Sequence, residues 1–421
     1  WTDISVEEIG EYELNIVLEE AYAPFIENFT FGIMPAHIWG GVPVDQLPFS
    51  QFNTEPIGSG PFAVSDVGRG TSGLINRYTL TAFRNNVSDP KINTIELLFY
   101  QNEEELLAAF DEKEIDTTAY LPQEQIKDIV SDKYQLIEKP LPRTFGIFFN
   151  QNKSIVLRDK AVREALTAIT NRDTLIENSL HGYGVPIEGP TTISQLELKS
   201  EDNIQSNGSS TPTKTKEAAE ILEAGGWSRN DQNHWEKEID EETVILSLTL
   251  RTSNAPLFNA LTDSVVEQWK AIGIEVTTEQ FEQTGLVQSV IRPRDFEALL
   301  YGLDISRSYD LYPFWHSSQQ DDPGLNIAQY TNVSVDELLE TARTEQSPEK
   351  RISALAEAGE IITEEHPAIF LFQPTFTYVV NKKITMADIN NLGRPADRFS
   401  NVAEWHTESN SLWRLFRDDS M

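Results

Sequence analysis

Regular alternation of strand and helix patterns between residues 243 and 301 is the feature that most restricts the fold of this chain. Residues 243–251 place apolar side chains at every second position, which predicts a β-strand. Residues 257–269 then carry apolar side chains at every fourth position, which predicts a helix, and Gly273 is a typical residue for ending it. A strand followed directly by such a helix is the first half of a βαβ unit.

The same alternation continues to the end of this stretch. Residues 274–278 and 296–301 predict two more strands, and residues 285–291 predict the helix between them. A βαβαβ order builds a parallel sheet with right-handed crossovers, and its ligand-facing loops lie at the carboxyl ends of the strands. The fold class is therefore α/β, with residues 252–254 and 302–310 expected at the ligand-facing edge.

Polar and aromatic side chains crowd the loop that follows the third strand. Gly302 and Leu303 end the apolar run. The next side chains offer charge, aromatic faces and hydrogen-bond donors: Asp304, Arg307, Asp310, Tyr312, Trp315 and His316. A ligand pocket with a few fixed polar groups has this composition. A surface loop held down by its aromatic residues fits the same composition.

Composition excludes several classes of protein. A formal charge of −34 repels a polyanion, so nucleic acid is not an expected partner. The absence of cysteine excludes disulfides, thiol catalysis and thiolate metal sites. The 6 histidines lack the close spacing of a metal site, and no apolar stretch is long enough to span a membrane. The acidic surface gives a weak preference for cationic solutes.

Several separate blocks of the sequence carry a family resemblance. They are residues 33–37 (IMPAH), 56–62 (PIGSGPF), 148–150 (FFN), 157–166 (LRDKAVREAL) and 312–318 (YPFWHSS). In this order and spacing, the blocks resemble motifs of the extracytoplasmic solute-binding proteins of peptide and nickel ABC transporters, the family-5 type. The resemblance covers nearly all of the chain.

The resemblance implies a two-lobed fold like that of the periplasmic binding proteins, type II and cluster C-like. Residues 1–144 with 377–421 are expected to form lobe I, and residues 145–376 to form the inserted lobe II. The chain then crosses between the lobes twice, near residues 141–149 and 372–380. Both stretches predict strands, so a two-strand hinge that permits closure over a ligand is expected.

The start of the chain differs from the family pattern. Family members usually carry a long segment before the block at residues 33–37, whereas only 32 residues precede it here. The resemblance therefore implies that lobe I is N-terminally incomplete. It also implies an extracytoplasmic location, and any lipoprotein anchor would lie upstream of Trp1.

The resemblance also points to a ligand contact. Peptide binders of the family commonly use an aspartate shortly after the strand's glycine to hold the α-amino group of the ligand. Counting from Gly302, that position is Ser306, and Asp304 and Asp310 flank it. Either aspartate replaces the missing one, or the ligand lacks a free amino group. Arg307 either binds a ligand carboxylate or pairs with Asp310.

The complete set of expected ligand-binding residues includes positions outside the loop. They are Gly302, Leu303, Asp304, Arg307, Asp310, Tyr312, Trp315, Phe145 and Asn150. Tyr312 and Trp315 fit a core position as well as a cleft position. Phe145 and Asn150 are assigned from the hinge argument alone.

The implied function is capture of a peptide or similar small solute between the lobes and its delivery to ABC permease subunits in the membrane. Such a protein is expected to be a monomer without a cofactor, and not an enzyme. Two alternatives remain: a secreted hydrolase that uses Asp304 and Asp310 as a carboxylate pair, and a sensor or interaction module with the same fold.

Local signals predict further elements. Asn102 with Glu105 is expected to cap a helix, and Ser334 with Glu337 to form a capping box. Residues 200–215 are rich in Ser, Thr and Asn, and are expected to form a surface loop.

Overall fold

The computed structural model describes residues 4–30, 32–84, 88–190, 211–305, 309–389 and 392–407. Contacts divide the chain into two compact units. Unit 1 comprises Trp1–Asn28 and Pro142–Thr375, and unit 2 comprises Phe29–Leu141 and Phe376–Met421. In this division the N-terminal residues belong with unit 1, although the sequence assigned them to lobe I. Which residues form each lobe stays a prediction.

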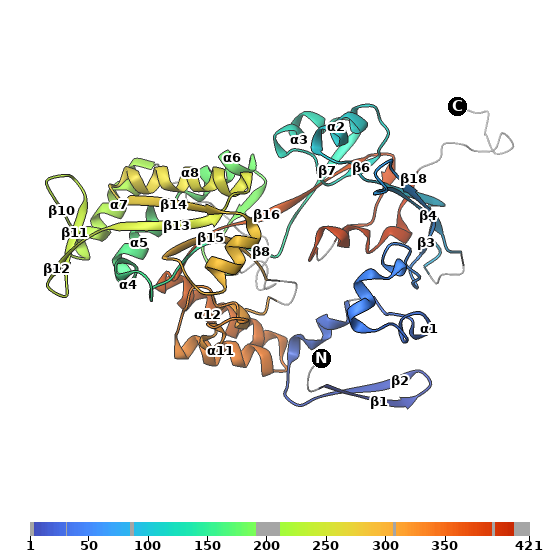
Figure 1. Ribbon diagram of the computed structural model, residues 1–421, viewed down its shortest axis with the longest axis horizontal. Coiled ribbons are helices and arrows are strands. Elements are labelled where there is room, and N and C mark those ends of the chain that lie inside the picture. The colour runs from blue at the N-terminus through green and yellow to red at the C-terminus, as the bar shows by residue number, and fades with distance from the viewer. Residues whose placement is uncertain are drawn as a thin grey trace, which may run out of the picture. The chain divides into compact units, whose positions relative to one another are not determined.

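A mixed sheet forms the centre of unit 1 (Figure 1). Its strand order is β14 (Glu275–Phe281), β13 (Ser247–Ser253), β15 (Ala298–Asp304), β8 (Arg143–Phe149) and β16 (Ala368–Asn381). Strand β13 pairs in parallel with both β14 and β15, which confirms the predicted βαβαβ unit. Strand β8 pairs antiparallel with β15 and β16, so both stretches predicted as hinge strands are indeed strands.

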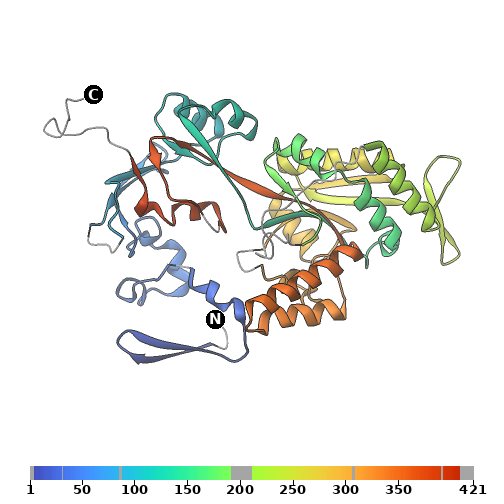
Figure 2. The same ribbon diagram turned by 180° about the vertical axis from the view of Figure 1, so that it is seen from behind.

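Helices cover both faces of this sheet (Figures 1 and 2). On one face lie α5 (Lys160–Ile169), α6 (Arg172–Leu180), α7 (Thr211–Ala224) and α8 (Pro256–Ala271), and on the other lie α11 (Val333–Thr344) and α12 (Pro348–Glu365). The apolar side chains form two core clusters, one containing Leu300 of β15 and the other containing Leu299. Since neighbouring strand residues point to opposite faces, β15 is buried on both sides.

Three predictions of element boundaries were wrong. Residues 243–251 are not one strand: β12 (Glu242–Ile245) ends before the fully buried Leu246, and β13 begins after it. Helix α11 is capped by Asn332, whose side chain accepts the N–H groups of residues 334 and 335, and not by Ser334. Residues 211–215 belong to α7, while the rest of the predicted loop lies outside the described residues. These errors concern only where an element begins or ends. The alternating apolar pattern and the residue types that cap helices extend past the true ends of the elements, so the sequence does not mark the ends sharply.

Unit 2 contains an antiparallel sheet of β3 (Phe62–Arg69), β4 (Ile75–Ala82) and β5 (Thr94–Leu98). Helix α2 (Glu103–Asp111) follows this sheet, and its predicted cap is confirmed. The Asn102 side chain accepts the Glu105 N–H at 2.9 Å, and the Glu105 carboxylate accepts the N–H of Gln101. A small apolar core surrounds Tyr378 and Trp405.

The remaining elements are short. In unit 1 they are β1 (Ile4–Gly10), β2 (Glu13–Leu18), α4 (Ile155–Arg158), β9 (Gly184–Pro186), β10 (Ser228–Arg229), β11 (Trp235–Ile239), α9 (Gln283–Leu286) and α10 (Tyr312–Trp315). In unit 2 they are α1 (Ala36–Trp39), β6 (Thr117–Thr118), α3 (Gln123–Ile129), β7 (Tyr134–Pro140), β17 (Ile384–Thr385) and β18 (His406–Thr407).

Asp159 joins the start of α5 to the neighbouring part of unit 1. Its carboxylate accepts hydrogen bonds from the Ala161 N–H at 3.0 Å, the Trp227 indole at 3.0 Å and the Lys237 ammonium at 2.7 Å. Burial alone would raise the pKa of this carboxyl. The hydrogen bonds from Lys237 and Trp227 outweigh burial, so the pKa of Asp159 lies below its ordinary value.

We expect Asp159→Asn to lower the free energy of unfolding by about 1–2 kcal/mol at neutral pH, because an amide replaces a hydrogen-bonded charge. A depressed folded pKa stabilises the protein above the unfolded pKa, and this stabilisation disappears as the pH falls through the folded value. Urea unfolding near pH 7 and near pH 3 should therefore show a gap between the two proteins that narrows in acid. Asp263→Asn, at an exposed position of α8, is the control. A gap of equal size at both pH values would contradict the assignment.

Candidate functional site

The carboxyl end of β15 is shaped by a glycine beneath an aromatic ring. Gly302 pairs with Phe145 of β8. A Cβ atom at residue 302 would meet the Phe145 ring at 3.1–3.3 Å, which is tighter than ordinary van der Waals contact, so glycine at this position lets the ring lie against the strand without strain. The same ring stacks on Phe372 of β16, with centroids 4.9 Å apart and planes inclined by 12°. The stacked rings of Phe145 and Phe372, called the aromatic floor below, thus lie against the carboxyl end of β15.

Asp304 is the last residue of β15 and remains accessible from solvent. Leu303 before it is buried in the core. The Asp304 side chain is 59% exposed, and its Oδ2 atom lies 3.4 Å from Nε of Arg143 on the paired strand. An ion pair at this distance between two exposed side chains is weak. The exposed part of this carboxylate can be reached by a ligand from solvent.

Asp310 is held by strong internal contacts. Arg343 of α11 donates to it through Nε and Nη2, with the shortest distance 2.7 Å. The Tyr22 hydroxyl donates at 3.2 Å and the Tyr312 N–H at 3.1 Å. The carboxylate side chain is only 10% exposed. Burial, together with the negative charge of Asp310, raises the pKa of Tyr22. These donors occupy the carboxylate of Asp310, so it anchors the loop and is a poor partner for a ligand.

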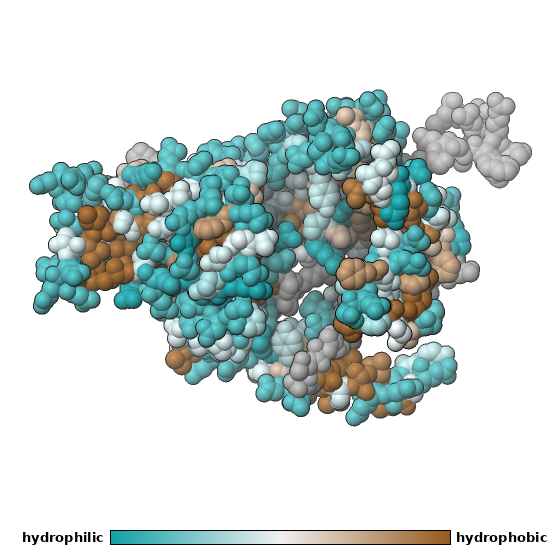
Figure 3. Space-filling model, viewed as in Figure 1, coloured by the Kyte–Doolittle hydropathy of each residue, from teal (hydrophilic) through white to brown (hydrophobic). Residues whose placement is uncertain are grey.

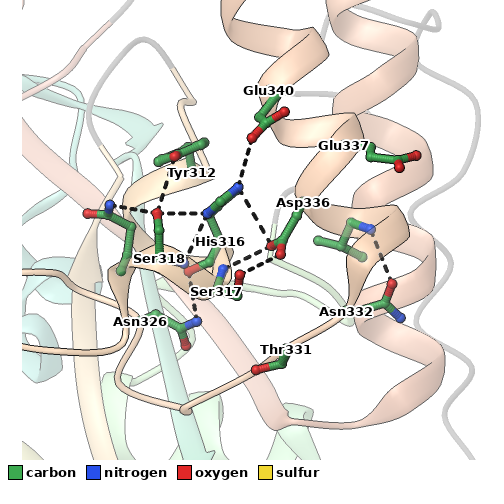
Figure 4. Close-up of polar contacts among 12 residues, drawn as sticks. Tyr312, His316, Ser317, Ser318, Asn326, Thr331, Asn332, Asp336, Glu337 and Glu340 are labelled. Carbon is green, nitrogen blue, oxygen red and sulfur yellow. Dashed lines mark hydrogen bonds and ion pairs between the residues drawn. The ribbon is translucent and has the colours of Figure 1, made fainter.

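Tyr312 belongs to a second polar cluster, which ties the loop to α11 (Figure 4). Its ring stacks on His316 at 4.0 Å, and the guanidinium of Arg343 lies 3.8 Å from the ring centroid. His316 Nδ1 lies 2.8 Å from Oγ of Ser318, and its Nε2 lies 3.4 Å from a Glu340 carboxylate oxygen. The cluster therefore fixes residues 312–318 against α11.

The structure assigns two predicted ligand contacts to the core of unit 1. Trp315 is buried, and its ring packs against Phe148 and Phe370. Asn150 is also buried, and its side-chain amide donates to the carbonyl oxygen of Arg294 at 2.9 Å. Both side chains stabilise the core of unit 1, and we do not propose them as ligand contacts. Arg307 and Ser306 lie outside the described residues.

Sequence reasoning missed the partners that organise this loop. Arg343, Tyr22 and Glu340 are far from the loop in sequence, and nothing in their local pattern marks them as its partners. Arg343 lies in α11 beside the buried residue Ala342. Its local sequence therefore predicts a helix but does not indicate a partner in the loop. Metal-binding groups are also absent from the described ranges: no three His, Cys, Asp or Glu side chains gather there in a suitable arrangement.

The fold and this edge of the sheet define a solute-binding protein, and sequence comparison identifies the family. The family described as bacterial extracellular solute-binding proteins, family 5 Middle, matches residues 1–324, and the chain belongs to this family. Because the family consists of solute-binding proteins, this chain is a solute-binding protein and not an enzyme. The hydrolase alternative is therefore wrong.

Two curated relatives show how far the similarity extends. The oligopeptide-binding protein AppA of Bacillus subtilis is 27% identical over 388 residues, covering 88% of this chain and 67% of AppA. Protein XP55 of Streptomyces lividans is 24% identical over 375 residues, covering 86% of this chain and 63% of that protein. The chain thus spans about two thirds of the length of these curated relatives.

Solved structures confirm the predicted fold class. AppA of Bacillus subtilis in complex with a nonapeptide has a TM-score of 0.69 at 24% identity, covering 97% of this chain and 79% of that one. A putative peptide-binding protein of Clostridium difficile has a TM-score of 0.78 at 20% identity, covering 96% and 79%. The fold is that of the two-lobed family-5 solute-binding proteins, which are extracellular. In the described ranges, no helix combines the length and apolar character needed to cross a bilayer.

Proposed function

We propose that this chain is the peptide-binding component of an ABC importer, which captures a peptide outside the cytoplasm and delivers it to permease subunits in the membrane. We further propose that it acts as a monomer, either in the periplasm or, if it carries a lipid anchor, at the outer face of the cell membrane. The names of the relatives support the peptide as the solute, because AppA is an oligopeptide-binding protein and was solved with a nonapeptide. The chain's strong negative charge favours a ligand with a free ammonium group.

The geometry of Asp304 is the observation that carries this proposal. Of the two aspartates that flank position 306, Asp310 is 10% exposed and occupied by Arg343 and Tyr22, whereas the Asp304 side chain is 59% exposed and its ion pair with Arg143 is long, at 3.4 Å. Asp304 also ends the strand that carries Gly302 and so stands at the carboxyl edge of parallel strands. We assign it the role of holding the α-amino group of the peptide, with Gly302 and Phe145 beneath the ligand's first residue.

The proposal is tested first by native mass spectrometry of gently purified protein, followed by denaturation and identification of whatever is released. Peptides of a narrow length range are the expected result. A released metal complex or sugar would contradict the peptide assignment while leaving the family membership untouched. If the protein is purified without bound solute, it is titrated with a random nonapeptide library. Failure to retain any peptide would also contradict the peptide assignment.

Asp304→Asn should weaken binding of peptides with a free N-terminus by about tenfold, because a charge-assisted hydrogen bond becomes a neutral one. Isothermal titration calorimetry with a co-purified peptide, or with one retained from the library, measures the change. The N-acetylated form of the same peptide should bind both proteins weakly and almost equally. The control Asp263→Asn should bind like the unaltered protein. Equal losses for both forms of the peptide would mean that Asp304 does not hold the amino group.

A further inference from the structure

Two aromatic side chains lie on the same face of the unit 1 sheet as the Asp304 carboxylate. Side chains alternate along a strand, so those of Leu300 and Asp304 point to one face of β15. Leu300 belongs to the core cluster against which the partly buried rings of Phe145 and Phe258 pack. The carboxylate that we assign to the amino group of the solute therefore shares a face of the sheet with these two rings.

Strand register places the first ring close to Asp304. Phe145 lies opposite Gly302, and its ring lies in the space that a Cβ atom at residue 302 would crowd. Asp304 follows Gly302 by two residues, which is about 7 Å along a strand. A large side chain on the residue bound at Asp304 can bridge that distance and rest on the ring.

A second ring, from the helix that follows β13, enlarges this apolar surface. Phe258 lies in the first turn of α8, which begins just after the carboxyl end of β13. Its ring centroid is 5.8 Å from that of Phe145, with planes inclined by 35°. The fully buried Phe372 supports Phe145 from within the core. Phe145 and Phe258, called the first-residue patch below, thus form a fixed apolar surface.

The charges beside the first-residue patch offset each other. Arg143 lies opposite Asp304, and their oppositely charged side chains are 3.4 Å apart. A charged first side chain therefore gains little net attraction here, while it loses hydration against the rings. An apolar side chain gains by leaving water, and an aromatic one gains further by stacking. The face of the molecule seen in Figure 3 is mostly hydrophilic, so two partly exposed rings near a carboxylate are not typical of this surface.

We propose that this edge of unit 1 selects peptides whose first residue is aromatic or large and aliphatic, with Phe145 and Phe258 as the specificity-determining residues. The inference rests on the proposed function, because it needs a peptide whose α-amino group binds Asp304. The first side chain then lies on the first-residue patch and buries part of both rings. A peptide that begins with phenylalanine should bind about tenfold more tightly than the same peptide beginning with alanine.

A random nonapeptide library with free N-termini tests this selectivity on the whole chain. Among the retained peptides, aromatic and large aliphatic residues should be enriched about fivefold or more at the first position, relative to the starting library. Retained peptides without this enrichment, or with equal enrichment at every position, would overturn the inference and leave the proposed function standing. Retention of no peptide would overturn both.

Variants of the first-residue patch test which residues select. Phe258→Ala should lower the enrichment about threefold or more, while Phe258→Leu keeps an apolar surface and should retain most of it. Phe145→Leu is a second test, because it removes the stacked ring but keeps most of the volume, and it should lower the preference for aromatic over aliphatic residues. Val333→Ala, at a side chain that is 70% exposed in α11, is the control. Enrichment that is the same in all these variants would overturn the assignment.

Calorimetry separates direct contact from a general loss of structure. One retained peptide is made in two forms, with phenylalanine or alanine as its first residue, and each form is titrated into the unaltered chain and into Phe258→Ala. Direct contact predicts that the variant narrows the ratio of the two dissociation constants from about tenfold to about threefold. A loss of affinity that is equal for both forms, with the ratio unchanged, would overturn the role of Phe258 as a specificity-determining residue.

Discussion

Replacing Arg163 with methionine is expected to lower the free energy of unfolding of unit 1 by about 3 kcal/mol or more. Arg163 is 6% exposed, and its guanidinium donates to the carbonyl oxygens of Leu157, Arg158, Glu365 and His366. These carbonyls lie at the carboxyl ends of α4 and α12, where helices have unpaired acceptors and partial negative charge. Methionine keeps the packing of the side-chain stem but leaves the acceptors without donors.

Urea unfolding followed by circular dichroism measures this loss. The matched control is Arg292→Met, since the side chain of Arg292 is 54% exposed and its ion pair with Asp322 is long, at 3.7 Å. We expect the control to change stability by less than about 0.5 kcal/mol. Burial lowers the pKa of Arg163, with Glu365 and Asp159 opposing that effect. A variant as stable as the control would mean that water replaces the guanidinium at all four carbonyls.

Phe372→Ala is expected to destabilise unit 1 by about 3–5 kcal/mol. The Phe372 ring is fully buried in the core cluster that contains Leu300, and it stacks on Phe145 directly beneath the carboxyl end of β15. Removing it leaves a cavity that the surrounding strands cannot close. The same change removes the support of Phe145, so peptide affinity should fall as well.

Thermal unfolding and peptide titration together check this prediction. Leu325→Ala, at a side chain that is 46% exposed, is the control and should cost less than about 1 kcal/mol. Phe372→Leu should recover most of the lost stability, because it refills part of the volume, but not the ring stacking with Phe145. If Phe372→Ala cost no more than the control, the aromatic floor would contribute little to the core.

The candidate site could be predicted only in part. The sequence located the loop after β15 and its two aspartates, because a buried strand ending at Gly302 is a local signal. It did not reveal that Asp310 pairs with Arg343. The two residues are 33 positions apart in sequence, and they meet only because α11 packs near the loop. Nor did it reveal that Trp315 and Asn150 are buried, because burial is decided by the whole core and not by local composition.

By itself, the sequence determined the class of the fold and the family. Strand and helix periodicities are local properties, so the βαβαβ order and the strands near residues 141–149 and 372–380 follow from residue spacing. Tertiary structure alone decided which polar groups are satisfied. Arg163 finds its acceptors at two helix ends, Asp310 pairs with Arg343, and Asp304 remains exposed, because each outcome depends on side chains that meet only after distant segments pack together.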